Sequence, residues 1–328
     1  MANILIVGDG AIGLLLSHFL SASHNVSVLT RKNPTNTRFY SRAKGASKKI
    51  DAKFISLNQL DKATEFDVIL FTVKAFQVLD AFSQIKPFLP THCSVVLSHN
   101  GMGNVDEINN QLNTHQALYF LTTSIAGFKS NQYIVQHTGE GQSVIGGCNE
   151  LALQNSAPIA DIFKVIPNLK FTNNIQQLRF EKLLVNIAIN PLSALSNVKN
   201  GELRAPKYNT IIFNALTEAC NIAKAQGLNI PLIKALNTAY KIMELTANNY
   251  SSMQQDIAHN RETEISAICG YISQQGKLHS IPTPYNDELL VKIQAKKAWY
   301  KPRLYKLLTL RAINFYSFEA LFVQHKCL

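Results

Sequence analysis

Three glycines near the start of the chain stand at the spacing that dinucleotide-binding loops use. Gly8, Gly10 and Gly13 follow a short apolar run and precede a helical pattern from Leu14 to Leu20. In such a strand, turn and helix, the first glycine permits the tight turn, the second lets the backbone approach a pyrophosphate, and the third allows close helix packing. We therefore predict a nucleotide site, with an incidental glycine turn as the alternative. The predicted loop comprises Gly8, Asp9, Gly10, Ala11, Ile12 and Gly13.

The end of the next predicted strand, Val26 to Thr30, indicates which nucleotide binds. NAD-preferring domains usually carry an acid about 20 residues after the glycines, where it bonds the ribose 2′-hydroxyl. This chain has Arg31 there, followed by Lys32. A guanidinium fits a 2′-phosphate, so NADPH is the expected cofactor, although both cations could be ordinary solvated charges. Asp9 is a departure, because a carboxylate beside a pyrophosphate is repulsive unless it points away.

A polar stripe on an otherwise apolar helix is the second candidate for chemistry. Lys182, Asn186 and Asn190 are spaced four residues apart, which places them along one side of a helix whose other positions are apolar. An ordinary surface helix carries a wider charged face with Lys and Glu rather than two amides. The stripe therefore indicates a polar cleft lining, and an exposed edge on a buried helix is the alternative.

Serines and a glutamate form a third constellation. Ser251 and Ser252 each have a glutamine three residues later, so both are candidates for a helix N-cap. A helix start with hydroxyls also suits a carboxylate ligand, so the residues alone do not choose between capping and binding. Glu264 stands among apolar neighbours and fits either a cleft carboxylate or a surface acid.

The elements that must position these residues change character half-way along the chain. The first half has short apolar runs separated by lengths suited to crossover helices, which predicts a parallel sheet with helices. Residues 132–147 read as a hairpin added to the sheet edge. We expect a dinucleotide-binding domain over residues 1–168, a helical substrate domain over 169–300 and a basic extension over 301–328.

The second half reads as helical, and a substrate cleft is expected between the two domains, outside the carboxyl ends of the strands. The predicted helices run from about Ile175 to Ser196, Tyr208 to Gln226, Leu232 to Asn248 and Gln254 to Gln275.

Composition predicts a well-folded cytoplasmic protein. Of 328 residues, 46% are hydrophobic and 16% are charged, which makes long disorder unexpected. The first strand begins at Asn3, leaving no room for a signal peptide, and no apolar run reaches the roughly 18 residues that span a bilayer. The five cysteines are widely spaced without a C-x-x-C pair, so we expect reduced thiols and neither a disulfide framework nor a metal site.

The formal charge of +11 is concentrated at the C-terminal end. Between Lys292 and Lys326 eight basic residues stand against one acid, Glu319, so this stretch alone contributes +7. The remainder is typical of an enzyme with anionic ligands, and no nucleic-acid partner is expected. Residues 303–323 could form a cationic amphipathic helix, which we expect to pack on the body or on a partner subunit before it contacts a membrane.

Several motifs together resemble the ketopantoate reductases, from residue 1 to about residue 298. Asn-Gly-Met-Gly and the Lys-Asn-Asn helix are far more specific than the glycine motif. In family order, the motifs are Gly8-x-Gly10-x-x-Gly13, Arg31, Thr72-Val-Lys74-Ala-Phe-Gln77, His99-Asn100-Gly101-Met102-Gly103, Lys182-x-x-x-Asn186-x-x-x-Asn190-Pro191-Leu192, Asn200-Gly201-Glu202-Leu203, Ser251-Ser252-Met-x-x-Asp256 and Thr263-Glu264-Ile265.

The resemblance implies an N-terminal Rossmann-like domain and an all-α C-terminal domain of the 6-phosphogluconate-dehydrogenase type. It implies NADPH-dependent reduction of 2-dehydropantoate (ketopantoate) to (R)-pantoate on the route to pantothenate and coenzyme A, and a possible homodimer. Lys182 matches the general acid, and Glu264 an acid at the reacting centre and the nicotinamide ribose. The matching substrate contacts are Asn100, Lys182, Asn186, Asn190, Asn200, Asn249 and Ser252. The matching cofactor contacts outside the glycine loop are Arg31, Lys74, Asn100, Ala126 and Glu264.

Three departures from the family pattern point to a retuned pocket. Ser266 and Cys269 stand where the family often carries Asp and Asn, and Ser124 stands where it often carries a histidine. A reductase of another 2-keto acid is therefore the nearest alternative. From a different class, the alternative is a non-catalytic NADPH-binding regulator that uses its basic tail.

Overall fold

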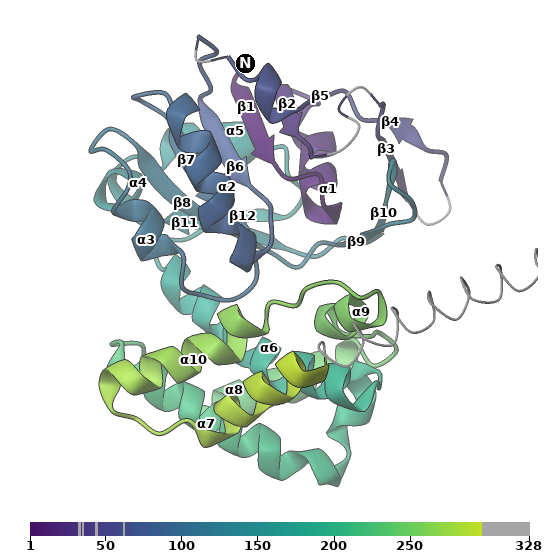
Figure 1. Ribbon diagram of the computed structural model, residues 1–328, viewed down its shortest axis with the longest axis vertical. Helices are drawn as coiled ribbons and strands as arrows, with labels where there is room; N and C mark the ends of the chain where they lie inside the picture. Colours follow the sequence, from purple (N-terminus) through teal and green to yellow (C-terminus); the bar gives the residue numbers. More distant parts are fainter. Residues whose placement is uncertain (32–33, 35, 43–44, 62, 297–328) are drawn as a thin grey trace, which may run out of the picture. The chain divides into compact units, whose positions relative to one another are not determined.

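The computed structural model describes residues 1–31, 34, 36–42, 45–61 and 63–296 (Figure 1). The chain divides into two compact units, Met1–Leu183 and a second one that begins at Leu184. The helix expected over residues 303–323 lies outside the described residues. Within the described parts of the chain, none of the helices combines the length and the apolar character that crossing a membrane requires.

The first unit is built on an eight-stranded sheet in the order β12-β11-β8-β7-β6-β1-β2-β5. The six strands from β8 to β5 are parallel, whereas β11 runs antiparallel to β8 and is parallel to β12. The strand order reverses at β1, which is the switch point where α/β sheets bind ligands. The strands are β1 Asn3–Val7, β2 Asn25–Leu29, β5 Lys53–Ile55, β6 Val68–Phe71, β7 Ser94–Leu97, β8 Ala117–Thr123, β11 Ser143–Gly147 and β12 Leu169–Phe171.

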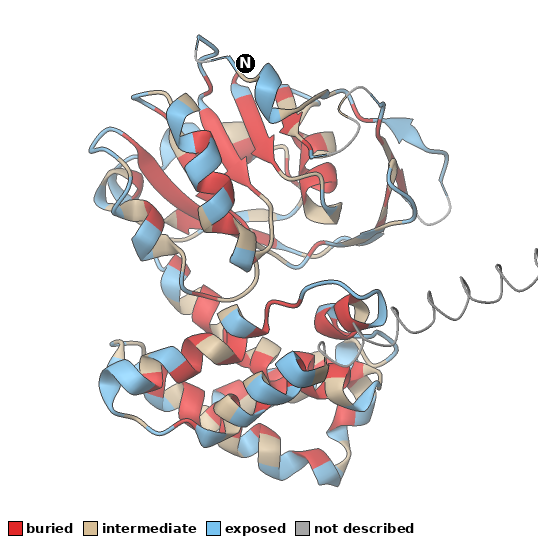
Figure 2. Cartoon of the chain, viewed as in Figure 1, coloured by how far each residue is buried: buried red, intermediate tan, exposed pale blue. Residues whose placement is uncertain are grey.

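Both faces of this sheet are covered, so its central strands are almost continuously apolar (Figure 2). In β1, Ile4 and Ile6 pack on one side against α1 and α5, while Leu5 and Val7 pack on the other side against α2 and α3. The helices are α1 Ala11–Leu20, α2 Val78–Ile85, α3 Val105–Asn109, α4 Glu150–Gln154 and α5 Ala157–Phe163, and the short 3₁₀ turns are η1 Leu57–Gln59, η2 Ala75–Gln77 and η3 Lys86–Phe88.

A smaller sheet lies beside α1 (Figure 1). Its pairing differs from the hairpin that the sequence predicted. Its strands are β4 Lys48–Lys49, β3 Phe39–Arg42, β10 Ile134–Gly139 and β9 Ala126–Lys129, in that order. The expected pairing of the two strands within residues 132–147 is wrong, because β10 pairs with β3 and β9 while β11 joins the main sheet. Gly141, at φ +56°, presses so closely on the backbone of Ser124 that a Cβ would overlap it, and the chain crosses there from one sheet to the other.

The second unit is helical, as predicted, but one predicted helix is two. The segment expected from Gln254 to Gln275 is broken after α9, where Asn260 adopts a left-handed φ of +53° and Arg261 pairs with Asp256. This break places Glu264 at the start of α10. The elements are α6 Ile175–Ser196, which begins in the first unit, η4 Asn200–Arg204, η5 Pro206–Tyr208, α7 Asn209–Ala225, α8 Leu232–Leu245, α9 Ser252–Ala258, α10 Ile265–His279 and a helix over 284–296.

The last described helix is anchored at both ends. The buried Glu218 of α7 accepts hydrogen bonds from the backbone N–H groups of Tyr285 and Asn286 and from the Asn286 amide, at 2.7–2.9 Å. Lys296 donates to two carbonyls in the last turn of α6, at 2.7 and 2.8 Å. Charged groups at helix ends satisfy backbone groups that have no partner within their helix. Glu218 therefore holds the start of the last described helix, and Lys296 joins its end to the last turn of α6.

Candidate active site

The glycine loop leaves β1 at the carboxyl edge of the sheet with a backbone that only glycine tolerates. Gly8 has a φ of +113°, and a Cβ on Gly13 would overlap the Gly8 carbonyl oxygen. Thr72 holds the loop from the next strand, because its Oγ1 atom donates to the Gly8 oxygen at 3.0 Å. A Cβ on Gly10, in contrast, would meet nothing within 4 Å. The loop is thus closed on the protein side and open at Gly10, which fits a pyrophosphate.

The first turn of α1 also suits an anion. Gly10 is the N-cap and provides no side-chain hydrogen bond, and the first turn carries no acid. The N–H groups at a helix start carry partial positive charge that a phosphate can accept. Ala11 and Ile12 open this turn, so the six predicted loop residues together fit the phosphates of a dinucleotide.

Four of the other predicted cofactor residues follow the carboxyl ends of neighbouring parallel strands, whereas the fifth, Glu264, belongs to the second unit. Arg31 is exposed just after β2, Lys74 comes three residues after β6, and Asn100 comes three residues after β7. Ala126 is exposed at the start of β9, shortly after β8. The structure therefore brings these four residues to the edge of the sheet where the glycine loop lies.

The Asp9 side chain points into a group of polar residues of the first unit. Its Oδ2 atom accepts a hydrogen bond from Thr30 Oγ1 at 3.0 Å. The same atom lies 3.6 Å from Lys129 Nζ and 3.8 Å from Arg38 Nη2. The direction that the sequence left open is therefore toward cations that compensate the carboxylate.

The loop after β7 is shaped by two further glycines. Gly101 and Gly103 have φ values of +83° and +113°, a backbone that other residues rarely adopt. Asn104 donates to the Ala75 carbonyl at 2.8 Å and so ties this loop to the turn that follows Lys74. The His-Asn-Gly-Met-Gly motif thus forms part of the same polar edge as the glycine loop.

Lys182 lies at this edge too. It is half-buried on α6, and its Nζ atom donates to the Thr123 carbonyl at the end of β8, at 2.8 Å. One turn earlier, the buried guanidinium of Arg179 lies 3.7 Å from the centre of the Phe120 ring and donates to the Gly101 carbonyl at 3.4 Å. The ammonium of Lys182 is therefore held at a fixed point beside the carboxyl ends of the strands.

His99 adds no positive charge to this region. Its Nδ1 atom lies 3.0 Å from the Asn100 carbonyl, which can only accept, so the proton of the neutral ring sits on Nδ1. Burial above all, together with the charges of Arg179 and Lys182, lowers the pKa of His99 to about 3, although the hydrogen bond to the Asn100 carbonyl acts to raise it. The ring stays neutral at physiological pH, so no imidazolium stands beside Lys182.

In the second unit, the predicted amides lie at different depths. Asn186 is half-buried and Asn190 is buried, four residues apart on α6. Asn200 is buried; its Nδ2 atom donates to Thr246 Oγ1 at 2.9 Å, and its backbone N–H donates to the Asn249 carbonyl at the same distance. The Oδ1 atom of Asn200 has no hydrogen-bond partner among the described residues. A buried acceptor of this kind fits a ligand hydroxyl.

The structure separates the roles of the two serines. Ser251 is the N-cap of α9, and its Oγ atom accepts from the Gln254 N–H at 3.1 Å. Ser252 is the first helical residue and is exposed, as is Asn249. Of the two capping candidates, only Ser251 caps, which leaves Ser252 as the residue available to a ligand.

Glu264 is buried at the N-cap of α10, and its carboxylate does not cap that helix. Two departures from the family pattern follow it. Ser266 is exposed, whereas Cys269 is fully buried and packs in the core of the helical unit. Of these two changes, only Ser266 lies on an accessible surface.

The four cysteines among the described residues are not activated as nucleophiles. Burial raises the pKa of Cys93, Cys148 and Cys220 to about 11, and burial with the nearby Glu218 raises that of Cys269 further. The reactive form is the thiolate, so these groups are inert at neutral pH. Cys327 lies outside the described residues.

Four contributors to this region were absent from the sequence prediction. Arg179 stands three residues before Lys182 on a predicted helix, so helical spacing could have indicated it. Thr123 contributes a backbone carbonyl, and Arg38 and Lys129 come from the small sheet. No pattern in the sequence points to these three, because strand pairing alone brings Thr123 to Lys182 and the two cations to Asp9.

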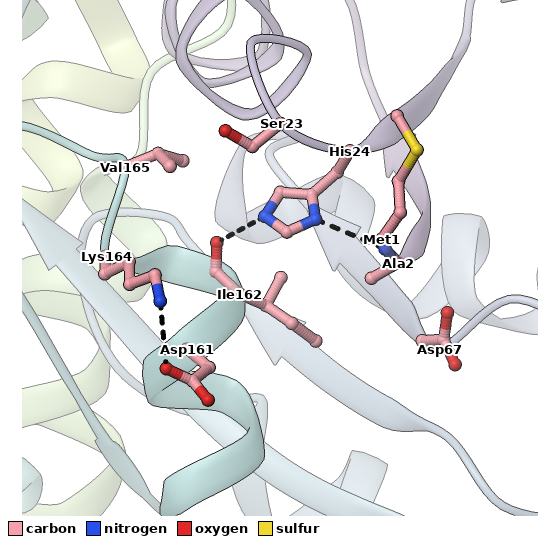
Figure 3. A pocket seen from close by; sticks show the side chains of 9 residues that line it. All are labelled: Met1, Ala2, Ser23, His24, Asp67, Asp161, Ile162, Lys164 and Val165. Carbon is pink, nitrogen blue, oxygen red and sulfur yellow. Dashed lines mark hydrogen bonds and ion pairs between the residues drawn. The ribbon is translucent and has the colours of Figure 1, made fainter.

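A separate hollow lies at the other end of β1, away from the glycine loop (Figure 3). It has a volume of about 360 Å³. His24 is one of the residues that line it. The Ala2 N–H donates to His24 Nδ1 at 3.2 Å, and His24 Nε2 lies 2.9 Å from the Ile162 carbonyl. Both ring nitrogens are engaged in hydrogen bonds to the backbone, and none of the predicted site residues lines this hollow.

Comparison with known proteins agrees with the geometry. The family description "Ketopantoate reductase PanE/ApbA" matches residues 4–150, and "Ketopantoate reductase PanE/ApbA C terminal" matches residues 174–297. The chain belongs to the ketopantoate reductase family. The predicted family and the predicted fold class, an α/β dinucleotide-binding domain followed by an all-α domain, are thereby confirmed.

Relatives of this family match nearly the whole chain. The 2-dehydropantoate 2-reductase of Vibrio cholerae serotype O1 is 36% identical over 304 residues, which are 91% of this chain and 99% of that protein. The crystal structure of a probable 2-dehydropantoate 2-reductase from Bacillus subtilis is 26% identical, with a TM-score of 0.78 over 90% of this chain and 99% of that one. These names support the oxidoreductase activity predicted from the sequence, ketopantoate reduction.

A solved structure with another enzyme name has a similar fold. D-mandelate dehydrogenase, in a ternary structure with NADH and anilino(oxo)acetate, superposes with a TM-score of 0.83 at 22% identity, over 90% of this chain and 98% of that chain. At this identity the likeness concerns the fold alone.

Proposed function

We propose that this chain reduces 2-dehydropantoate to (R)-pantoate with NADPH, with Lys182 as the general acid. One observation carries the proposal: Lys182 is held by the Thr123 carbonyl at the edge of the sheet where the glycine loop lies, and Asn186 and Asn190 follow it on the same helix. A fixed ammonium, amides at helical spacing and a phosphate-binding loop are the groups that this reaction needs.

The loop and its neighbours would hold the dinucleotide. The residues proposed to do so are Gly8, Asp9, Gly10, Ala11, Ile12, Gly13, Arg31, Lys74, Asn100, Ala126 and Glu264. When bound, the nicotinamide supplies the hydride that the ketone carbon accepts. Arg31 is the reason to expect NADPH, because a guanidinium after β2 suits a 2′-phosphate where NAD-binding domains carry an acid.

The chain's own residues would then manage charge and position on the substrate. The Lys182 Nζ atom stabilises the negative charge that develops on the former ketone oxygen and transfers a proton to it. Amide, hydroxyl and ammonium groups hold the substrate hydroxyl and carboxylate, which fixes the geometry for attack. The residues proposed for this role, together with Lys182, are Asn100, Asn186, Asn190, Asn200, Asn249 and Ser252, and Glu264 is proposed to act at the reacting centre.

The decisive test is steady-state turnover of a panel of 2-keto acids by the purified chain, with NADPH and with NADH. We expect the highest kcat/KM for ketopantoate, because a site built to bond the hydroxyl of its substrate rejects analogues that lack it. A higher kcat/KM for a smaller or an aromatic 2-keto acid would favour the alternative reductase. Binding of NADPH without any turnover would favour the regulator. A homodimer, a cytoplasmic location and the absence of a nucleic-acid partner stay predictions.

A further inference from the structure

A carboxylate stands inside a loop that we propose to bind phosphates, and its partners bear on how the chain selects its dinucleotide. The charge cluster consists of Asp9, Thr30, Arg38 and Lys129. Both cations approach the same carboxylate oxygen of Asp9, Lys129 at 3.6 Å and Arg38 at 3.8 Å. Two positive groups face one negative group, so the charge cluster carries one net positive charge.

The Arg38 side of the charge cluster is rigid. Its side chain is 2% exposed, and its guanidinium lies over the rings of Phe54 and Tyr133, at 5.1 and 5.2 Å from their centres. Its Nη1 atom also donates to the Asn36 carbonyl at 2.6 Å. Arg38 cannot turn toward another anion without losing these contacts, so its charge stays with Asp9.

The Lys129 side of the charge cluster is more open. Its side chain is 29% exposed, and its Nζ atom donates to the backbone oxygen of Asp9 at 3.0 Å in addition to facing the carboxylate. Of the two positive charges of the cluster, Lys129 is therefore the one that borders on solvent, and it also donates to the backbone of the glycine loop.

The charge cluster lies where dinucleotide-binding domains recognise the ribose. Thr30, which donates to Asp9, directly precedes Arg31 at the end of β2. In NAD-binding domains an acid near this point accepts the 2′-hydroxyl. Here the Oδ2 atom of Asp9 is engaged by a hydroxyl and two cations instead. The charge of the carboxylate is thus compensated by the protein, and its Oδ2 atom already accepts a hydrogen bond from Thr30.

We propose that Lys129 is a specificity-determining residue for the dinucleotide, because its charge compensates Asp9 and keeps the field at the end of β2 positive toward a 2′-phosphate. This inference rests on the proposed function. Replacing Lys129 by a neutral residue brings the charge cluster to a net charge of zero. NADPH, which carries about two more negative charges than NADH at this position, then loses more affinity than NADH does.

A double-mutant cycle on the full chain tests the proposal, with the Kd of NADPH and of NADH measured by fluorescence titration. Lys129→Met should raise the Kd of NADPH by on the order of tenfold and that of NADH clearly less. Asp9→Asn, which adds a positive charge, should leave NADPH binding as tight or tighter. The double variant has the net charge of the native chain, so its NADPH Kd should return to within about threefold of the native value.

Two matched variants complete the design. Lys129→Arg keeps the charge and should retain the native ratio of the two Kd values. Lys224→Met removes an exposed lysine of α7, with the same change in total charge, and should alter neither Kd. Thermal unfolding of each variant checks that the fold is intact.

The proposal is overturned if Lys129→Met weakens both dinucleotides equally, or if the double variant binds NADPH as poorly as Lys129→Met does. Either result would mean that Lys129 acts through its bond to the loop backbone or through a direct phosphate contact. A loss of NADH binding in Asp9→Asn would instead assign Asp9 to the ribose hydroxyl. Native protein that binds NADPH with the expected cycle but does not turn over ketopantoate would defeat the proposed function and leave this inference standing.

Discussion

The residues proposed for function include backbone groups of a glycine loop in the first unit and side-chain amides in the second. In the first unit, the glycine loop offers backbone groups, and its shape depends on the absence of side chains at Gly8 and Gly13. In the second unit, Asn186, Asn190 and Asn200 offer side-chain amides from helices that would form with other residues at those positions. A backbone site is fixed by packing and fails when its shape changes. A side-chain site can be retuned by substitution while the fold persists.

The largest effect is expected where the side-chain chemistry is indispensable. Lys182→Ala removes the only group proposed to protonate the substrate oxygen, so kcat should fall by about 10²- to 10⁴-fold. The Kd of NADPH should change little, because the glycine loop remains. Rapid-mixing and steady-state assays with ketopantoate measure kcat, and fluorescence titration measures the Kd of NADPH. Lys182→Arg keeps the charge without a readily lost proton and should recover only part of the rate. A kcat within tenfold of native for Lys182→Ala would remove Lys182 from the mechanism.

The backbone site can be broken by a single methyl group, and the two glycines differ in how. In Gly13→Ala the new Cβ overlaps the Gly8 oxygen and lies 2.6 Å from Thr72 Oγ1, so unfolding should become easier by about 1–3 kcal/mol and NADPH binding should be lost. In Gly10→Ala the Cβ meets no protein atom within 4 Å. That variant should keep the native unfolding free energy within about 0.5 kcal/mol and still bind NADPH more weakly.

Urea unfolding and dinucleotide titration on the two variants separate stability from binding. If Gly10→Ala bound NADPH as tightly as the native chain, the open space at Gly10 would not be where the phosphates lie.

The same contrast explains what the sequence could predict. The glycine motif predicts its site because each glycine has a local backbone reason, and helical spacing places Lys182 and Asn190 on one helix without knowledge of the fold. The small sheet was beyond such reasoning. β3 and β10 pair although nearly a hundred residues separate them, and no local pattern predicts that Arg38 and Lys129 meet at Asp9.

Turn chemistry accounts for the remaining errors. The predicted helix over residues 254–275 ignored Asn260, which tolerates the left-handed conformation and ends α9. The expected hairpin around Gly141 has the right turn residue, but its strands find partners in different sheets. At Asn260 the signal was local, whereas around Gly141 pairing with distant strands decided the outcome.

A moderate effect is expected from a substitution at Asn200. This residue belongs to the second unit, so the change tests the side-chain amides and leaves the glycine loop intact. Asn200→Ala removes the buried Oδ1 acceptor, so the KM for ketopantoate should rise about tenfold with a smaller change in kcat. The matched control is Thr246→Val, which removes the hydroxyl that accepts from Asn200 Nδ2 and donates to the Ile242 carbonyl, and leaves the Asn200 Oδ1 atom in place. It should lower the unfolding free energy by about 1 kcal/mol and affect KM much less. An unchanged KM in Asn200→Ala would place the substrate elsewhere.

The smallest effect concerns the neutral His99 beside Lys182. Burial and the charges of Arg179 and Lys182 lower its pKa to about 3 in the folded protein, against about 6.5 in the unfolded chain. Between these values the unfolded chain binds a proton that the folded protein refuses, so stability falls as the pH falls below about 6.5. His99→Gln removes this group, and its unfolding free energy should lose about 1 kcal/mol less than the native one between about pH 6 and pH 5 in urea titrations. Parallel losses would mean that His99 accepts the proton in the folded state and that a second cation accompanies Lys182 at acid pH.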